Sequence, residues 1–289
     1  MTTLLDDNVH NIALEGTFDD CQDAVKAMFN HHAFRDRVSL SGVNSINWAR
    51  IMAQIVYYFS SALSLGAPDR PVSFTVPTGN FGDIFAGYAA KRMGLPIERL
   101  VIATNDNDIL ARTLASGEYR TGGVVVTTSP SMDIQVSSNF ERLLFEASER
   151  DAAAVRRYMA GLKQSGAFTI DATPLSRIRG DFDAGRATMA ETAATIRKTL
   201  EASSYLADPH TATALHVAAQ HDDPAVPMIV LSTAHPAKFP AAVEEASGIK
   251  PDLPAWLDGL MERAEKYVTL PSALNMVEDY IGRHARAAG

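Results

Sequence analysis

A turn within residues 73–94, SFTVPTGNFGDIFAGYAAKRMG, has the residue types and spacing of an anion-binding site. An apolar run ends at Pro77, a polar loop with Gly79 and Gly82 follows, and a helix-like segment begins near Asp83. Backbone N–H groups at the start of a helix lack intrahelical acceptors and lie at the positive end of the helix dipole. Glycines also let a backbone approach a ligand closely. The order of these elements therefore predicts a bound anion.

The same loop lacks the lysine of a GxxxxGK[ST] phosphate-binding loop, and it does not match the GxGxxG dinucleotide pattern. This difference favours a phosphate monoester held by backbone amides over a metal-chelated triphosphate. Asp83 falls in the first turn of the expected helix, where a carboxylate suits the dipole and can hydrogen-bond loop amides. An isolated G-x-x-G is also compatible with a tight strand-to-helix turn that binds nothing.

A second polar cluster, LSTAHPAKFP at residues 231–240, follows an apolar run. Ligands of open α/β sheets bind at the carboxyl ends of the strands, so Thr233 and His235 are well placed to face a ligand. The alternative is that Thr233 caps the next helix and that His235 lies on the surface.

A third cluster, SGVNSINWAR, places Asn44, Ser45 and Asn47 at the start of a long apolar helix. Helix capping accounts for one of these side chains. Three amide or hydroxyl groups within four residues exceed what a cap needs, so the cluster is also a candidate binding surface.

Other kinds of site find no support in the sequence. No G-x-S-x-G, H-E-x-x-H or CxxC pattern occurs, and the eight histidines show no metal-ligand spacing. Cys21 lies within an expected helix, where a buried thiol is the more common role than a nucleophile. We therefore expect no metal site.

Composition restricts the partners and the compartment. The chain has 289 residues and a formal net charge of −8, which argues against nucleic acid or an anionic membrane as a partner. No apolar run approaches the ~18 residues of a membrane span, and the N-terminus does not resemble a signal peptide. The single cysteine cannot form an internal disulfide. A cytoplasmic protein is expected.

The elements that must position these residues alternate between strand and helix patterns. Strands are expected at residues 11–16, 73–76, 99–105, 123–128 and 226–233, with helices between them, the longest at 47–65. The βαβα order predicts an α/β fold with a parallel twisted sheet and helices on both faces. The run at 226–233 is apolar throughout, as in a central parallel strand. Residues 140–220 are charged and alanine-rich, and they predict a mostly helical insertion.

Several motifs together closely resemble the threonine synthase family, in the longer form found in fungi and many bacteria. They are GVNSINWARIMAQIVYYF, VPTGNFGDIFAGYAAKRMGLPI, VIATNDNDIL, SPSMDIQVSSNFERLLFE, DPHTA and TAHPAKFP. The resemblance covers essentially the whole chain, and the motifs follow the family's order. The glycine loop alone would be a weak signal, whereas the set is specific.

The resemblance implies a pyridoxal-phosphate enzyme of the tryptophan-synthase-β-like class, fold type II, that turns O-phosphohomoserine and water into threonine and phosphate. It implies that Gly79, Asn80, Phe81, Gly82 and Asp83 hold the cofactor phosphate and that the Thr233 hydroxyl meets the pyridine nitrogen. The substrate is an anion at both ends and needs helix N-termini or arginine forks. The candidates for contacting it are Asn44, Ser45, Asn47, Arg50, Asn139 and Arg142.

One departure from the family concerns the lysine that forms the Schiff base, which in the family lies in a Phe-Lys-Asp context. None of the seven lysines of this chain has that context. We therefore expect residues 1–289 to be the C-terminal portion of a large catalytic domain, with the N-terminal domain absent and the lysine upstream. Two hypotheses follow: a threonine synthase by lineage that is inactive as this chain alone, or a non-catalytic phosphate-ligand-binding or subunit-association module.

Overall fold

The strands form three separate sheets in the computed structural model, which describes residues 1–16 and 18–286. The largest is a four-stranded sheet in the order β6-β3-β2-β7, in which every pairing is parallel. Its strands are β2 (Val72–Pro77), β3 (Ile97–Thr104), β6 (Phe182–Arg186) and β7 (Met228–Val230). The parallel α/β fold expected from the sequence is therefore confirmed.

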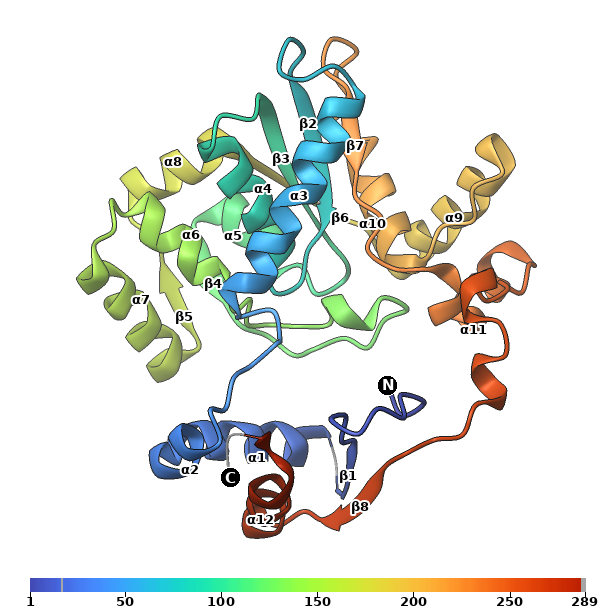
Figure 1. Cartoon of the computed structure of the whole chain (residues 1–289). Coiled ribbons are helices and arrows are strands. Elements are labelled where there is room, and N and C mark those ends of the chain that lie inside the picture. The colour runs from blue at the N-terminus through green and yellow to red at the C-terminus, as the bar shows by residue number, and fades with distance from the viewer. Residues whose placement is uncertain (17, 287–289) are drawn as a thin grey trace. The chain divides into compact units, whose positions relative to one another are not determined.

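Helices cover both faces of this sheet (Figure 1). Phe74, Leu100 and Ile102 project to the face that packs against α3 (Trp48–Ser64) and α4 (Gly82–Arg92). Val101 and Ala103 project to the opposite face and pack against α10 (Pro209–Ala218). Successive residues of β3 thus pack into two cores, which is why the strand is apolar without interruption from Leu100 to Ala103.

Helices α3 and α4 approach each other closely at Gly87. A Cβ atom at Gly87 would lie 2.4 Å from the Tyr58 ring, so only glycine leaves room for that ring on α4. Tyr58 is fully buried, and its ring centroid lies 4.7 Å from that of Phe74 on the sheet. This packing fixes the start of α4, and therefore the loop before it, against α3.

Residues 140–220 are mostly helical, and the sequence predicted them to be a helical insertion or flank. They contribute β6, which pairs with β3, and α10, which covers one face of the sheet. The elements between β3 and α10, apart from β6, are α5 (Ile109–Ser116), β4 (Glu118–Arg120), a 3-10 turn (Pro130–Met132), α6 (Phe140–Ala147), α7 (Ala152–Ser165), β5 (Ala167–Thr169), α8 (Ala172–Asp181) and α9 (Met189–Ser203). The strand expected at residues 123–128 is wrong: β4 ends at Arg120 and pairs with β5 instead.

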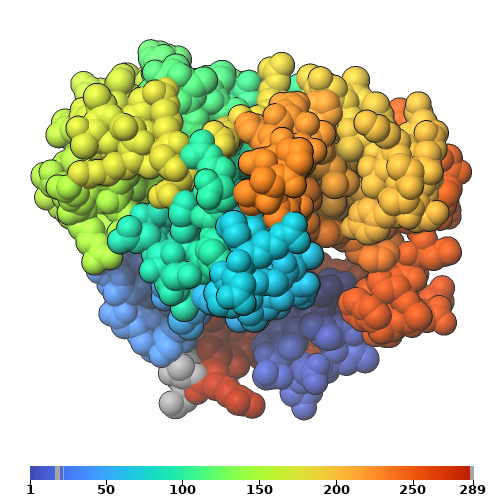
Figure 2. Space-filling model, turned by 90° about the horizontal axis from the view of Figure 1, so that it is seen from above, coloured from blue at the N-terminus to red at the C-terminus, as the bar shows by residue number. Residues whose placement is uncertain are grey.

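Strand β7 occupies an edge of the four-stranded sheet, not the centre that its apolar sequence predicted. The segments that lead into β2 and β7, cyan and orange in Figures 1 and 2, lie side by side at one end of the sheet. At the other end, β2 stops at Pro77 and β7 at Val230, and polar loops follow both strands. After β7 come a 3-10 turn (Pro236–Lys238) and α11 (Pro240–Ser247).

The two ends of the chain form a second compact unit, from Met1 to Gly42 and from Leu253 onward, distinct from residues 43–252. Both units lie within the range that the sequence assigned to one catalytic-domain portion, residues 1–289. The unit contains β1 (Ile12–Glu15), α1 (Phe18–Asn30), α2 (His32–Arg37), two 3-10 turns (Ala255–Leu257 and Leu260–Glu262), β8 (Val268–Pro271) and α12 (Leu274–His284). Strands β1 and β8 pair in parallel, and Met28, Phe34, Val38 and Val277 form the core. None of the described helices combines the length and apolar character that crossing a membrane requires.

Candidate functional site

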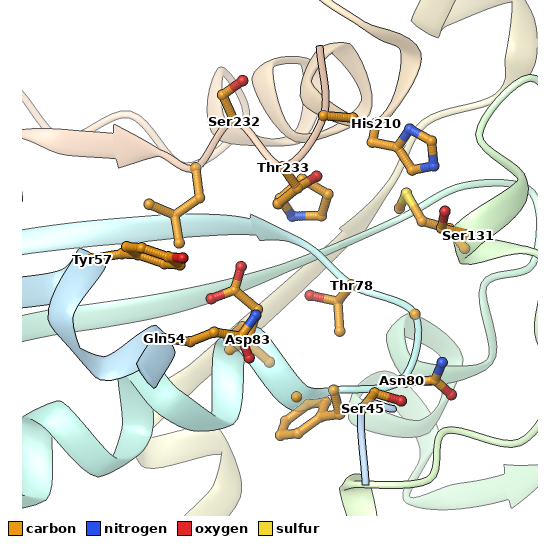
Figure 3. A pocket seen from close by; sticks show the side chains of 18 of the residues that line it. Ser45, Gln54, Tyr57, Thr78, Asn80, Asp83, Ser131, His210, Ser232 and Thr233 are labelled. Atoms are coloured by element: carbon orange, nitrogen blue, oxygen red, sulfur yellow. The ribbon is translucent and has the colours of Figure 1, made fainter. Parts of the chain in front are cut away.

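A pocket of about 550 Å³ lies at the carboxyl ends of β2 and β7 (Figure 3). Asp83 and Thr78 lie on one side of it, and Thr233 and His210 lie on the other. The lining residues come from the start of α3, the loop after β2, the turn at residues 131–132, the start of α10 and the loop after β7: Ser45, Arg50, Gln54, Tyr57, Pro77–Ile84, Ser131, Met132, His210, Leu231–Ala234 and Lys238. The sequence predicted a site at this end of the sheet.

The loop after β2 presents backbone donors that the protein does not use. The N–H of Thr78 makes the last bond of the strand, to the carbonyl oxygen of Ala103 at 2.8 Å. Within the described part of the chain, the N–H groups at residues 79–84 have no acceptor. They comprise the loop and the first turn of α4, where the helix dipole is positive. The arrangement suits an anion, as the sequence predicted.

The unusual backbone conformation of this loop falls on Phe81 and not on a glycine. Phe81 has φ 64° and ψ 6°, the left-handed region that a side chain adopts at a cost of ~1–2 kcal/mol. Its ring is buried against Phe140 and Phe182, with centroids 5.3 and 5.8 Å away, and this packing offsets the cost. Glycine is required at position 79 for a steric reason, because a Cβ atom there would lie 2.6 Å from the Ser131 carbonyl oxygen.

Asn139 holds the loop in place from outside the pocket. Its side-chain nitrogen donates to the carbonyl oxygens of Ser45 at 2.8 Å and Asn80 at 2.9 Å, and its own side-chain oxygen accepts from Arg142 at 3.0 Å. Arg142 also donates to the Ile46 carbonyl oxygen at 2.9 Å. Both residues were candidates for substrate contact. They lie outside the pocket lining, and the fold accounts for their polar groups.

The cluster at the start of α3 divides in the same way. Asn47 is the N-cap of α3, and its side chain accepts from the Ala49 N–H at 2.9 Å. Asn44 accepts from the Ile46 N–H at 3.2 Å. Neither lines the pocket, whereas Ser45 and Arg50 do. Of the six residues expected to contact a substrate, the structure brings these two to the pocket.

Asp83 lines the pocket, and the partner of its carboxyl group is Tyr58, not the loop amides expected from the sequence. The Tyr58 hydroxyl lies 3.2 Å from the Asp83 carboxylate and 2.8 Å from its carbonyl oxygen. Burial raises the pKa of Asp83 from 3.8 to about 6, although the Tyr58 hydrogen bond and the charge of Arg50 oppose this shift. Near neutral pH the pocket therefore contains a carboxyl group that is easily protonated.

The loop after β7 brings Thr233 to the pocket but not His235. Thr233 is exposed and lines the pocket, and it does not cap a helix. His235 caps the 3-10 turn that follows, where its Nδ1 accepts from the Ala237 N–H at 3.2 Å, and it lies outside the lining. Of the two residues that the sequence predicted to face a ligand, Thr233 therefore remains the candidate.

The sequence patterns did not single out His210, although it lies within the DPHTA motif. Asp208 is the N-cap of α10 and accepts from the His210 N–H at 2.8 Å, from the His210 Nδ1 at 3.0 Å and from the Thr211 hydroxyl. Burial by itself raises the pKa of Asp208, but the hydrogen bonds from His210 and Thr211 outweigh this effect and lower it. A histidine two residues after a capping aspartate is a signal that could have identified the pair.

The pocket also has positive charge. Among the described lining residues, the basic side chains are those of Arg50, Lys238 and His210. Lys238 lies 5.7 Å from the centroid of the Phe239 ring. The other lysines do not line the pocket, and the described residues contain no cluster of acidic, histidine or cysteine side chains that would hold a metal ion.

Comparisons with known proteins agree with this fold. A family described as "Threonine synthase, C-terminal" matches residues 211–281. Threonine synthase from Pseudomonas aeruginosa is 50% identical over 98% of this chain. The crystal structure of a PLP-bound threonine synthase from Brucella melitensis has a TM-score of 0.96 and 65% identity over 99% of this chain. Yeast threonine synthase has a TM-score of 0.88 and 42% identity over 98% of it.

The fold is therefore the α/β class known among pyridoxal-phosphate enzymes as fold type II, in the form that threonine synthases have. Within this class the chain is a relative of the threonine synthases and corresponds to their C-terminal portion. It spans about three fifths of the relatives that it matches: 61% of the Pseudomonas aeruginosa protein and 62% of the Brucella melitensis chain.

Proposed function

We propose that this chain forms the cofactor-binding part of a threonine synthase, which uses pyridoxal phosphate to convert O-phosphohomoserine and water into threonine and phosphate. The observation that carries the proposal is the row of unused N–H groups at residues 79–84, at the carboxyl end of a parallel sheet. Their number and direction suit the phosphate of the cofactor. The identity of the ligand is supported by the similarity to threonine synthases, among them the PLP-bound protein from Brucella melitensis.

The residues of the pocket fit the other parts of this cofactor. Thr233 lies across the pocket from the loop, and we propose that its hydroxyl meets the pyridine nitrogen (Figure 3). A neutral hydroxyl does not favour a protonated ring as a carboxylate would. When bound, pyridoxal phosphate supplies an electron sink, and the Thr233 partner moderates it.

Ser45 and Arg50 are the proposed contacts of the substrate. Both residues line the pocket, and Arg50 is exposed. O-phosphohomoserine carries a phosphate and a carboxylate, so it requires cationic or N–H partners in addition to the cofactor site. We propose in addition that the substrate is a small molecule and that the protein works in a reducing compartment such as the cytoplasm.

We expect that this chain by itself does not form threonine. The reaction needs a lysine amine that moves protons at the substrate carbons, held within reach of the cofactor. Lys238 is the described lysine that lines the pocket, and it lies in the TAHPAKFP motif, not in a Phe-Lys-Asp context. For this reason we do not assign the role to Lys238.

The test combines ligand binding with chemical labelling. Purified protein is titrated with pyridoxal phosphate, then reduced with borohydride, and any modified lysine is located by mass spectrometry. We expect saturable binding, no stoichiometric label on Lys238 and no threonine from O-phosphohomoserine. Stoichiometric labelling of Lys238 together with threonine formation would overturn the expected inactivity.

The non-catalytic alternative gives a different result in the same experiment. A phosphate-binding module would bind inorganic phosphate and pyridoxal phosphate with similar affinity, because only the loop would contact the ligand. A preference for pyridoxal phosphate of less than tenfold would favour that module. A preference well above tenfold supports the proposed cofactor site.

A further inference from the structure

His210 carries a buried polar atom without a partner at the wall of the pocket. The residue is 3% exposed, and its Nε2 has no hydrogen-bond partner in the described part of the chain. Its ring forms part of the pocket wall beside Ser131 and Thr233 (Figure 3). Buried polar atoms almost always have partners, so an exception at a pocket points to a ligand that supplies one.

The surroundings of the ring fix its orientation. Nδ1 lies 3.0 Å from the Oδ1 of Asp208, and the ring centroid lies 4.7 Å from that of Phe239. The Asp208 side chain is fully buried, and it is held in turn by the Thr211 hydroxyl and by the His210 N–H. The ring is thus fixed by a carboxylate at one nitrogen and by an aromatic side chain at its face.

The Asp208 carboxylate also selects the tautomer of His210. A carboxylate accepts hydrogen bonds, so Nδ1 must carry the proton that joins the two groups. In the neutral ring, Nε2 is then an acceptor. With Nδ1 held by Asp208, the neutral ring therefore has its lone pair on Nε2, in a residue that lines the pocket.

We propose that Nε2 of His210 accepts a hydrogen bond from an O–H or N–H group of the phosphorylated ligand that the loop at residues 79–84 holds. Asp208 is the positioning residue for this contact. The inference rests on the proposed function only in taking the ligand to be pyridoxal phosphate with its substrate. The donor is either the ring hydroxyl of the cofactor or the ammonium group of the substrate, and the two arms of the test distinguish them.

The test records the ring nitrogens of His210 by long-range ¹H–¹⁵N NMR of the whole chain. In the free protein we expect the tautomer with the proton on Nδ1. 4-Deoxypyridoxine 5′-phosphate, which keeps the ring hydroxyl but has neither an aldehyde to react with a lysine nor an amino group, is added in one arm, and O-phosphohomoserine is added in the other. The ligand whose O–H or N–H group donates to His210 should shift the Nε2 resonance, whereas saturating inorganic phosphate should not shift it.

Two variants of His210 test whether the contact that shifts the Nε2 resonance also contributes to ligand affinity. His210→Leu should weaken binding of the ligand that shifts Nε2 by at least tenfold, and His210→Gln, which retains an acceptor, should recover part of that loss. Affinity for inorganic phosphate should remain within twofold in both variants. The matched control is His216→Gln on α10, whose ring lies 3.7 Å from Glu191 and does not line the pocket.

The backbone N–H signals of residues 79–84 separate the two proposals. If a ligand shifts these signals but neither ligand shifts Nε2, the role of His210 is overturned and the proposed function stands. The proposed role of Nε2 as an acceptor is also overturned by either of two results. One is a proton on Nε2 in the free protein, and the other is protonation of Nε2 when inorganic phosphate is added. If neither the loop signals nor Nε2 respond to either ligand, the proposed function fails together with this inference. The free-protein tautomer requires no variant, so a folding defect in His210→Leu does not remove the test.

Discussion

The loop at residues 78–83 and the segment at residues 44–50 are both rich in polar atoms, but they use them in opposite ways. The loop leaves its N–H groups at residues 79–84 without a protein acceptor. In the segment, the side chains of Asn44 and Asn47 accept from N–H groups two residues further along. Asn139 and Arg142 also donate hydrogen bonds to carbonyl oxygens of this segment.

The difference has a geometric cause. A side-chain amide next to a helix start can reach a free N–H group of the same turn, so it becomes a cap. Backbone N–H groups at the start of α4 point along the helix axis, and no side chain of the described residues reaches them. A binding site therefore develops where the fold leaves donors unused, and a high density of polar side chains is a weaker indicator. The predictions that follow test this distinction, from the largest expected effect to the smallest.

Gly82→Val should abolish the site at the loop. A Cβ atom at Gly82 would lie 3.4 Å from the Asn139 side-chain nitrogen and 3.6 Å from the Ser45 carbonyl oxygen, so the two methyl groups of valine must displace these neighbours or enter the pocket. We expect affinity for pyridoxal phosphate to fall at least ~100-fold, measured by absorbance or fluorescence titration.

Two milder variants serve as controls for this result. Gly82→Ala should fold normally and lose less affinity, because its methyl group makes a contact close to ordinary van der Waals distance. Gly180→Ala, where nothing lies within 4 Å of the added atom, should leave binding unchanged. Wild-type affinity in Gly82→Val would show that the loop does not hold the phosphate.

Asn139→Ala should lower the free energy of unfolding by about 3 kcal/mol, because it leaves the carbonyl oxygens of Ser45 and Asn80 and the Arg142 guanidinium with fewer partners. Urea denaturation measures the change. Excess ligand should recover part of the lost stability, since Asn139 acts through the loop. A weakened affinity with normal stability would instead make Asn139 a ligand contact and contradict the comparison.

Sequence patterns predicted the parts of this molecule that local rules determine. The alternation of strands and helices from β2 to α5 and the position of the loop at residues 79–83, between β2 and α4, follow from apolar periodicity and from the glycine pattern. The edge position of β7 and the pairing of β6 with β3 do not, because apolar content does not specify neighbours in a sheet.

The rest of the site depends on contacts between distant segments. Tyr58 reaches Asp83 across Gly87, and Phe81 adopts its left-handed conformation because its ring enters a core made with Phe140 and Phe182. His210 became a candidate only when the fold brought the start of α10 to the pocket. Such residues require the tertiary structure, whereas the caps at Asn47 and Asp208 were within reach of sequence rules.

Asp83→Asn should change how stability depends on pH. The pKa of Asp83 rises from 3.8 to about 6 on folding, so the folded state binds more protons than the unfolded state between these values. The free energy of unfolding that Asp83 contributes is therefore largest below pH ~4 and is lost as the pH rises through ~6. We expect the asparagine variant to match the wild type at pH 4 and to exceed its stability by about 2 kcal/mol at pH 8.

Urea denaturation of both proteins at several pH values measures this difference. Asparagine retains hydrogen-bonding groups for Tyr58, and all other titrating residues are common to the two proteins, so their contributions cancel. A stability difference that is constant from pH 4 to pH 8 would show that Asp83 is not desolvated as its burial indicates.

Asn47→Ala gives the smallest expected effect and the most direct test of the segment at residues 44–50. Loss of the N-cap of α3 should cost about 1 kcal/mol, because the Ala49 N–H loses its acceptor. Asn44→Ala should cost less, since its bond to the Ile46 N–H is longer, at 3.2 Å, and is exposed to water. Neither substitution should change affinity for pyridoxal phosphate or O-phosphohomoserine by more than twofold, because neither side chain lines the pocket. If Asn47→Ala weakened O-phosphohomoserine binding tenfold at unchanged stability, the segment would be a binding surface like the loop, and the contrast between the two regions would not hold.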